Sequence, residues 1–163
     1  MFIVVVGLSH RTAPVEIRDG VAVPDHALRY VLEKLSRLPA VAECALISTC
    51  NRSETYAVTE APEVVREGMV ETLCDLADLE PDQLKKHLFM YHDADAVRHL
   101  FEVASGLDSM IMGEPQIAGQ VKNAGAAALE AGASRTVLNR LFQTAAEVSK
   151  RARTETEIGV GAV

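Results

Sequence analysis

Residues 44–58, CALISTCNRSETYAV, decide the fold that we expect for this chain. Cys44 to Thr49 is a short apolar segment, Thr55 to Val58 is another, and a polar turn separates them. Two such runs joined by a short polar connection are typical of a β-hairpin. The sequence therefore predicts an antiparallel pair of strands at the centre of the first hundred residues.

The segment before this hairpin predicts a strand and then a helix. The β-branched run Phe2–Leu8 indicates a buried strand that opens into a loop at Ser9-His10. Pro24-Asp25 then begins a helix, and Pro39 stops it. The apolar residues of this helix follow helical spacing: Leu28, Val31, Leu32, Leu35 and Leu38.

The segment after the hairpin repeats the alternation of helix and strand. A helix is expected over 63–77, a strand over 88–91 and an amphipathic helix over 93–104. The order β-α-β-β-α-β-α matches the split βαβ, ferredoxin-like arrangement. We therefore predict an α+β sandwich of this type, followed by additional helices.

The last third of the chain predicts those helices. Gly106–Gly113 is a glycine-punctuated loop, and Pro115 suits the first turn of a helix that ends near Gly132. Ser134 can cap a last helix. Its apolar stripe consists of Val137, Leu138, Leu141, Phe142, Ala145 and Val148. If it runs to about Thr154 it is roughly 30 Å long, and its polar second half predicts a connector between domains.

Composition limits the classes of protein to which the chain can belong. Hydrophobic residues make up 48% and charged residues 24%, as in ordinary globular domains. The chain has neither a membrane-length apolar run nor the pattern of a signal peptide. Three cysteines without a repeating spacing fit a reducing, cytoplasmic location. The net charge of −7 disfavours unspecific nucleic-acid binding, and the basic cluster at 150–153 is interpreted as a solvated helix face.

Ser48-Thr49-Cys50-Asn51-Arg52 is the segment most suited to chemistry. An apolar strand delivers Cys50 to a turn two residues before Arg52. A nucleophilic thiol needs exposure, a fixed position and a nearby positive charge, and this segment can supply all three. The alternative is that Cys50 is a small hydrophobic residue at a strand edge, which is how we interpret Cys44 and Cys74.

Polar residues elsewhere allow similar pairs of interpretations. His99 lies between the apolar and polar faces of its helix, where it either packs as a border residue or points into a cleft. Ser109, Glu114, Gln116 and Gln120 surround a loop and a helix start, where capping and solvated glutamines are the simpler explanation. The histidines and cysteines lack metal-ligand spacing, so no metal site is predicted.

Three blocks together resemble the glutamyl-tRNA reductases. Their sequences are GLSHRTAPVE at 7–16, STCNRSETY at 48–56, and GLDSMIMGEPQI at 106–117, continued by Gln120-Val121-Lys122. They occur in the order and at the spacing of that family. Asp19, Ser53 and Ala118 are small departures from its usual residues. The resemblance covers nearly the whole chain.

The resemblance implies a division of the chain and a reaction. Residues 1–132 would be a catalytic domain, 133–158 the start of a long connector helix, and 159–163 the truncated start of an NADPH-binding domain. The family reduces glutamyl-tRNA(Glu) to glutamate-1-semialdehyde, the first step of five-carbon tetrapyrrole (porphyrin and heme) biosynthesis, with hydride from NADPH. This chain is expected to lack the reduction because the cofactor domain is missing.

The resemblance also implies roles for residues and partners. Cys50 would attack the glutamyl ester and form a thioester, and His99 would orient or polarise the reacting group. Arg52 would hold the substrate carboxylate. The pocket would be lined by Thr49, Asn51, Ser109, Glu114, Pro115, Gln116 and Gln120. The full-length protein is expected to form a homodimer and to work beside the next enzyme, the semialdehyde aminomutase.

Two other classes of protein remain open. A cysteine-dependent glutamyl ester hydrolase would also use Cys50, but it would release free glutamate even with NADPH present. A non-catalytic, amino-acid-binding ferredoxin-like domain would bind its ligand whether or not Cys50 is alkylated. The terminal Gly159-Val160-Gly161 resembles the start of a dinucleotide fingerprint but lacks the helix and acidic residue that complete one, so no cofactor site is predicted here.

Overall fold

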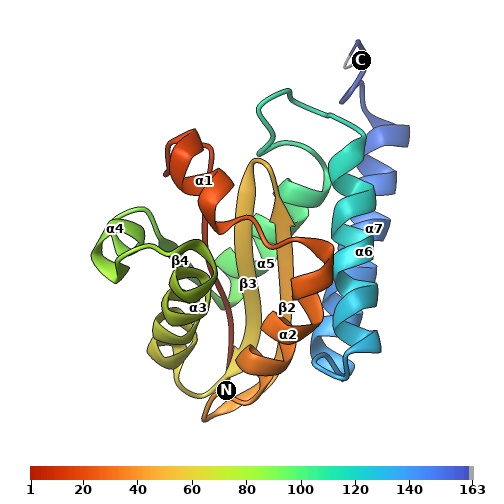
Figure 1. The fold of residues 1–163 in the computed structure, drawn as a ribbon. Helices are drawn as coiled ribbons and strands as arrows, with labels where there is room; N and C mark the ends of the chain where they lie inside the picture. The colour runs from red at the N-terminus through yellow and green to blue at the C-terminus, as the bar shows by residue number, and fades with distance from the viewer. Residues whose placement is uncertain (162–163) are drawn as a thin grey trace.

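A four-stranded antiparallel sheet forms the middle layer of the computed structural model, which describes residues 1–161 (Figure 1). Its strands are β1 (Phe2–Ser9), β2 (Val41–Thr49), β3 (Arg52–Thr59) and β4 (Phe89–His92). They lie in the order β2-β3-β1-β4, and every neighbouring pair is antiparallel. This is the strand order of the ferredoxin-like arrangement, so the predicted fold class is confirmed.

Helices cover both faces of this sheet. The described residues form α1 (Val15–Val21), α2 (Asp25–Ser36), α3 (Pro62–Ala77), α4 (Pro81–Lys85), α5 (Asp93–Ala104), α6 (Gln116–Glu130) and α7 (Thr136–Glu155). Of these, α2 and α3 pack on one face, and α5, α6 and α7 pack on the other. The sequence predicted five of them and missed α1 and α4. Those two span 7 and 5 residues, which is too short for helical periodicity to be visible.

Two hydrophobic cores result, one on each face of the sheet. Val4, Val6 and Leu8 of β1 pack with α2 and α3. Val5 points to the opposite face, where Tyr56 and the helices α5, α6 and α7 form the second core. Because successive side chains of a strand point to opposite faces, a strand covered on both sides is apolar throughout. This explains the unbroken β-branched run of β1.

The start of α7 corrects one prediction. Ser134 does not cap this helix, because its hydroxyl donates to Oδ1 of Asn139 at 2.6 Å. The buried carboxylate of Glu43 on β2 instead accepts hydrogen bonds from the backbone N–H groups of Arg135, Val137 and Leu138, at 2.8–3.0 Å. A carboxylate at a helix N-terminus satisfies free donors and opposes the helix dipole.

The predicted connector helix also contributes to the core. Leu138, Leu141, Phe142 and Ala145 of α7 are buried against the sheet, whereas Ser149 is the buried residue of its second half. The division of the chain at 132 and 158 stays a prediction. Ala162 and Val163, the last residues of the predicted segment 159–163, lie outside the described residues. Among residues 1–161, no helix has both the length and the apolar character needed to cross a membrane.

Candidate active site

Cys50 and Asn51 form the turn that joins β2 to β3, and neighbouring segments hold this turn in place. The Asn51 N–H donates to Oγ1 of Thr49 at 3.1 Å. The backbone N–H of His10 donates to the Asn51 carbonyl at 2.9 Å, and Nε of Arg18 reaches the Cys50 carbonyl at 3.4 Å. Cys50 is therefore a thiol on a tethered turn, with a guanidinium beside its own backbone.

The three cysteines of the chain differ sharply in their surroundings. Cys50 is exposed, whereas Cys44 and Cys74 are buried. Burial raises the pKa of the Cys44 thiol to about 12 and also raises the pKa of Cys74. A thiol must be accessible and able to ionise in order to act as a nucleophile. Cys50 is therefore the suitable candidate of the three.

Arg52 is enclosed by carboxylates of its own chain. Its side chain is 2% exposed, and Nη1 donates to Oε1 of Glu54 at 2.6 Å. Nη2 contacts Oδ2 of Asp108 at 3.0 Å and donates to the Asp108 carbonyl at 2.8 Å. Burial opposes the charged form, but the charges of Glu54 and Asp108 outweigh it and raise the pKa of Arg52. The guanidinium thus joins the hairpin to the loop after α5.

Glu54 lies at the centre of this buried group. Besides Arg52, its carboxylate contacts the hydroxyl of Tyr56 at 2.8 Å and Nε2 of His99 at 3.0 Å. Burial alone would raise the pKa of Glu54. The hydrogen bond from His99 and the charge of Arg52 outweigh burial and lower that pKa. Burial and the Glu54 charge together raise the pKa of Tyr56 well above its usual value.

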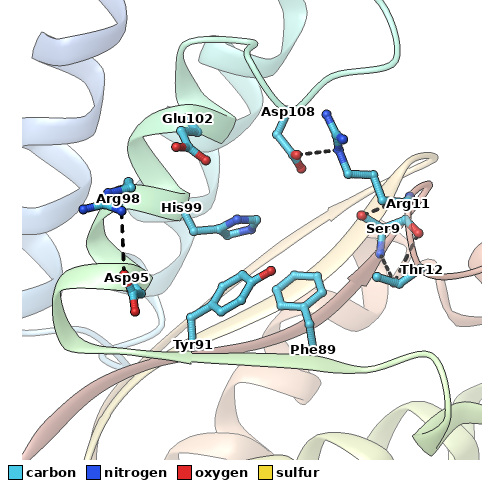
Figure 2. Close-up of a pocket in the computed structure, with 10 residues that line it drawn as sticks. All are labelled: Ser9, Arg11, Thr12, Phe89, Tyr91, Asp95, Arg98, His99, Glu102 and Asp108. Carbon is cyan, nitrogen blue, oxygen red and sulfur yellow. Dashed lines mark hydrogen bonds and ion pairs between the residues drawn. The ribbon is translucent and has the colours of Figure 1, made fainter.

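A cleft of about 300 Å³ opens beside this group, between α5, β4 and the loops that follow β1 and α5 (Figure 2). His99 of α5 and the stacked rings of Phe89 and Tyr91 on β4 point into the same space. The opposite wall carries Arg11, whose Nε contacts Oδ1 of Asp108 at 2.7 Å. The complete lining is Ser9, Arg11, Thr12, Phe89, Tyr91, Asp95, Arg98, His99, Glu102 and Asp108.

The loop from Gly106 to Pro115 is fixed at both ends. Gly106 and Gly113 both have positive φ, and the Gly113 N–H donates to the Gly106 carbonyl at 2.9 Å. Arg153, near the end of α7, donates to the carbonyls of Gly113 and Glu114, both at 2.9 Å. The β2–β3 turn, this loop and the C-terminal end of α7 lie at one end of the molecule (Figure 1).

Comparison with known proteins identifies this arrangement. The family model described as glutamyl-tRNA(Glu) reductase, N-terminal domain, matches residues 6–156. The chain belongs to this family.

Its relatives carry the same name. A glutamyl-tRNA reductase of Xanthomonas campestris pv. campestris (strain B100) is 48% identical over 159 residues, and one of Xanthomonas axonopodis pv. citri (strain 306) is 47% identical. Both alignments cover 98% of this chain and 35% of the relative, so the chain spans about a third of their length. The solved structure of the glutamyl-tRNA reductase from Methanopyrus kandleri superposes with a TM-score of 0.72 at 35% identity, over 95% of this chain and 35% of that one.

This member of the glutamyl-tRNA reductase N-terminal family brings some of the predicted site residues together. Cys50 and Asn51 form the hairpin turn directly after Thr49, and Arg52 and His99 both contact the carboxylate of Glu54. Ser109 lies half-buried in the loop that Arg52 ties to β3. His99 is 8% exposed and lines the cleft.

Other predicted residues lie farther from this group. Glu114 is half-buried, and its carbonyl is bound by Arg153, whereas Pro115, Gln116 and Gln120 are exposed around the start of α6. His99 and Ser9 line the cleft, whereas Cys50 is not among the lining residues. Ser9 pairs with Arg52 at the start of β3, and Cys50 lies two residues before Arg52, at the tip of the hairpin. The binding and catalytic roles of these residues stay predictions.

The acidic partners of Arg52, which are Glu54 and Asp108, were not predicted from the sequence. Glu54, Tyr56 and Asp108 were quoted within the resembling blocks but received no role. One signal was available, because Arg52, Glu54 and Tyr56 are spaced by two on a strand and must share a face. Three polar groups on one face of a buried strand indicate a buried hydrogen-bonded group.

Proposed function

We propose that this chain is the thioester-forming part of a glutamyl-tRNA reductase, the enzyme that reduces glutamyl-tRNA(Glu) to glutamate-1-semialdehyde with NADPH in tetrapyrrole (porphyrin and heme) biosynthesis. The observation that carries the proposal is the exposed Cys50 on a turn tethered by Thr49, His10 and Arg18. A nucleophile on such a turn meets a large substrate without rearranging the fold. Membership in the family supplies the nature of that substrate.

The proposed step is acyl transfer from oxygen to sulfur. The Cys50 thiolate attacks the ester carbonyl carbon, a C–S bond forms, and the C–O bond to the terminal ribose of the tRNA breaks. The ribose oxygen leaves with a proton from solvent or the site, and a glutamyl thioester stays on Cys50. Covalent catalysis of this kind divides a difficult reduction into two easier steps.

The polar residues at this end of the molecule are proposed to bind the glutamyl group. Thr49, Asn51 and Ser109 are half-buried beside the turn and loop, and Glu114, Pro115, Gln116 and Gln120 continue the surface toward α6. The side-chain carboxylate of the substrate's glutamyl group would bind at the linked group Arg11–Asp108–Arg52 rather than at Arg52 alone. Both terminal nitrogens of Arg52 already donate within the chain. The Arg11 side chain is 60% exposed and offers an accessible cation next to Asp108.

NADPH would supply the hydride when it is bound by the remainder of the protein. The described residues do not form the strand, glycine-rich turn and helix that hold a dinucleotide. Homodimerisation of the complete protein and contact with the semialdehyde aminomutase are further parts of the proposal. So is a cytoplasmic location.

An adduct assay tests the proposed step. The 163-residue chain is incubated with glutamyl-tRNA(Glu) carrying a radioactive glutamyl group, quenched in acid, and examined for label bound to protein and released by hydroxylamine. We expect a labelled wild-type chain and an unlabelled Cys50→Ser variant. Cys74→Ser is the matched control and should be labelled like the wild type, because Cys74 is buried in α3.

The outcomes separate the three classes of protein. Release of free glutamate, with no protein adduct even at the earliest time points, would favour a hydrolase. Binding of glutamyl-tRNA that persists after Cys50 alkylation, with neither adduct nor release, would favour a non-catalytic binding domain. Either result would contradict the proposed acyl transfer.

A further inference from the structure

Glu54 is a fully buried carboxylate for which β1 leaves room. It is 0% exposed, and it pairs with Gly7 in the antiparallel register of β1 and β3. A Cβ at Gly7 would lie 2.7 Å from Cγ of Glu54 and 2.8 Å from the Ser53 carbonyl oxygen, closer than packed atoms approach. A side chain at position 7 would therefore displace Glu54.

The surroundings of Glu54 favour its ionised form. Arg52, Tyr56 and His99 all place a donor-capable atom within 3.0 Å of its two oxygens. A carboxylate in its charged form only accepts hydrogen bonds, and three donors to a buried carboxylate offset the cost of burying its charge. The lowered pKa of Glu54 agrees with this geometry.

An ionised Glu54 determines which nitrogen of His99 carries the hydrogen. Because Oε1 of Glu54 can only accept, Nε2 of His99 must donate across their 3.0 Å contact. In the neutral ring Nδ1 then carries a lone pair. Nδ1 of His99 has no hydrogen-bond partner within residues 1–161. The ring lines the cleft beside Phe89 and Tyr91, whose ring centroids lie 5.1 and 5.2 Å from its own.

We propose that Glu54 is a positioning residue that holds His99 in the Nε2–H tautomer and so makes Nδ1 a hydrogen-bond acceptor for the substrate. This role rests on the proposed function. In the bound complex, Nδ1 of His99 would accept a hydrogen bond from a donor group of the substrate, such as the α-ammonium of the glutamyl moiety. A neutral ring held in this way cannot donate to the ester carbonyl. The proposal thus replaces polarisation of the carbonyl by His99 with acceptance of a hydrogen bond.

Nitrogen NMR of the chain without substrate tests the proposal. The 163-residue chain is labelled with ¹⁵N-histidine, long-range ¹H–¹⁵N correlations are recorded at neutral pH, and His99→Gln identifies the ring by the loss of its signals. We expect the wild type to show His99 protonated at Nε2 only. Glu54→Gln should lose this single-tautomer pattern, because an amide can present either its oxygen or its NH₂ group to the ring.

Tyr56→Phe is the matched control. It removes the donor to Oε2 of Glu54 but leaves the His99 contact to Oε1, so the His99 pattern should stay as in the wild type. A wild-type His99 protonated at Nδ1, or at both nitrogens, would overturn the proposal, as would an unchanged pattern in Glu54→Gln. If Glu54→Gln does not fold, the wild-type spectrum still decides. Failure of the adduct assay would leave this measurement unaffected, so the two proposals fail separately.

Discussion

Cys50 and Cys44 are six residues apart on one strand and its turn, yet the first is exposed and the second is buried. Cys44 is 1% exposed, and its Sγ lies 3.7 Å from the Leu32 carbonyl. Cys50 is exposed where the strand ends. A thiol reacts with an alkylating reagent as the accessible thiolate. Burial therefore protects Cys44 twice, because it blocks the reagent and makes ionisation of the thiol more costly.

Limited alkylation should therefore modify Cys50 first. With a small excess of iodoacetamide at neutral pH, peptide mass spectrometry is expected to find Cys50 labelled while Cys44 and Cys74 are unmodified. Cys44 should stay unmodified even at pH 9, because its pKa of about 12 keeps the thiol protonated. Labelling of all three cysteines in urea is the control for reagent and detection. Earlier labelling of Cys44 or Cys74 in the folded chain would contradict the assignment of Cys50.

At the residue scale, the sequence indicated the candidate nucleophile, Cys50, but only half of its surroundings. A cysteine at the end of an apolar run, followed by polar residues, can be recognised from the sequence alone. The partners of Arg52 are not, because Asp108 lies 56 positions away and reaches Arg52 through a loop. A charged side chain next to a cysteine is as consistent with a substrate contact as with a buried ion pair until its neighbours in space are known.

At the scale of elements, the fold was predictable where periodicity is strong. The hairpin, the strand at the N-terminus and the helix over 93–104 were found because their patterns last for several residues. The cap of α7 was not predictable, because the sequence offers Ser134 beside the helix while the structure uses Glu43 from another strand. A capping residue next to the helix competes for the free N–H groups with any carboxylate that another element of the fold places near them.

Glu43 makes the cap of α7 a testable contribution to stability. Glu43→Ala leaves three N–H groups of a partly buried helix start without their acceptor. Loss of a capping residue with charge-assisted bonds costs about 2 kcal/mol, so the urea midpoint should fall clearly with an unchanged slope. Glu147→Ala, an exposed glutamate on α7, is the matched control and should change stability by less than about 0.5 kcal/mol. Equal effects of the two substitutions would show that Glu43 is not the cap.

At the scale of the whole molecule, the site is held from two sides. Asp108 joins the loop to Arg11 and Arg52, and Arg153 joins the same loop to α7. A Cβ at Gly113 would collide with the backbone of Gly159, so the segment after α7 packs directly on the loop. The loop that carries Ser109 and Glu114 is therefore positioned by both the hairpin and the end of the long helix.

Removing the contacts between α7 and the loop over 106–115 should make the loop more mobile without unfolding the chain. Arg153→Ala deletes two hydrogen bonds from a guanidinium to the carbonyls of Gly113 and Glu114. Bonds to charged groups are worth about 1.5–3 kcal/mol, so amide exchange over residues 106–115 should accelerate roughly ten- to a hundredfold. Exchange in β1 and β3 should stay as in the wild type, because those strands are buried within the cores.

Arg151→Ala is the matched control for this measurement. Arg151 is on the same helix, but its guanidinium pairs with the exposed Glu155 at 3.0 Å. Deleting it removes a similar charge without touching the loop, so exchange over 106–115 should not change. If Arg153→Ala behaves like Arg151→Ala in hydrogen exchange measured by mass spectrometry, then the contacts of Asp108 alone fix the loop. Faster exchange confined to Arg153→Ala would instead show that the end of α7 controls the order of the loop that Arg52 contacts.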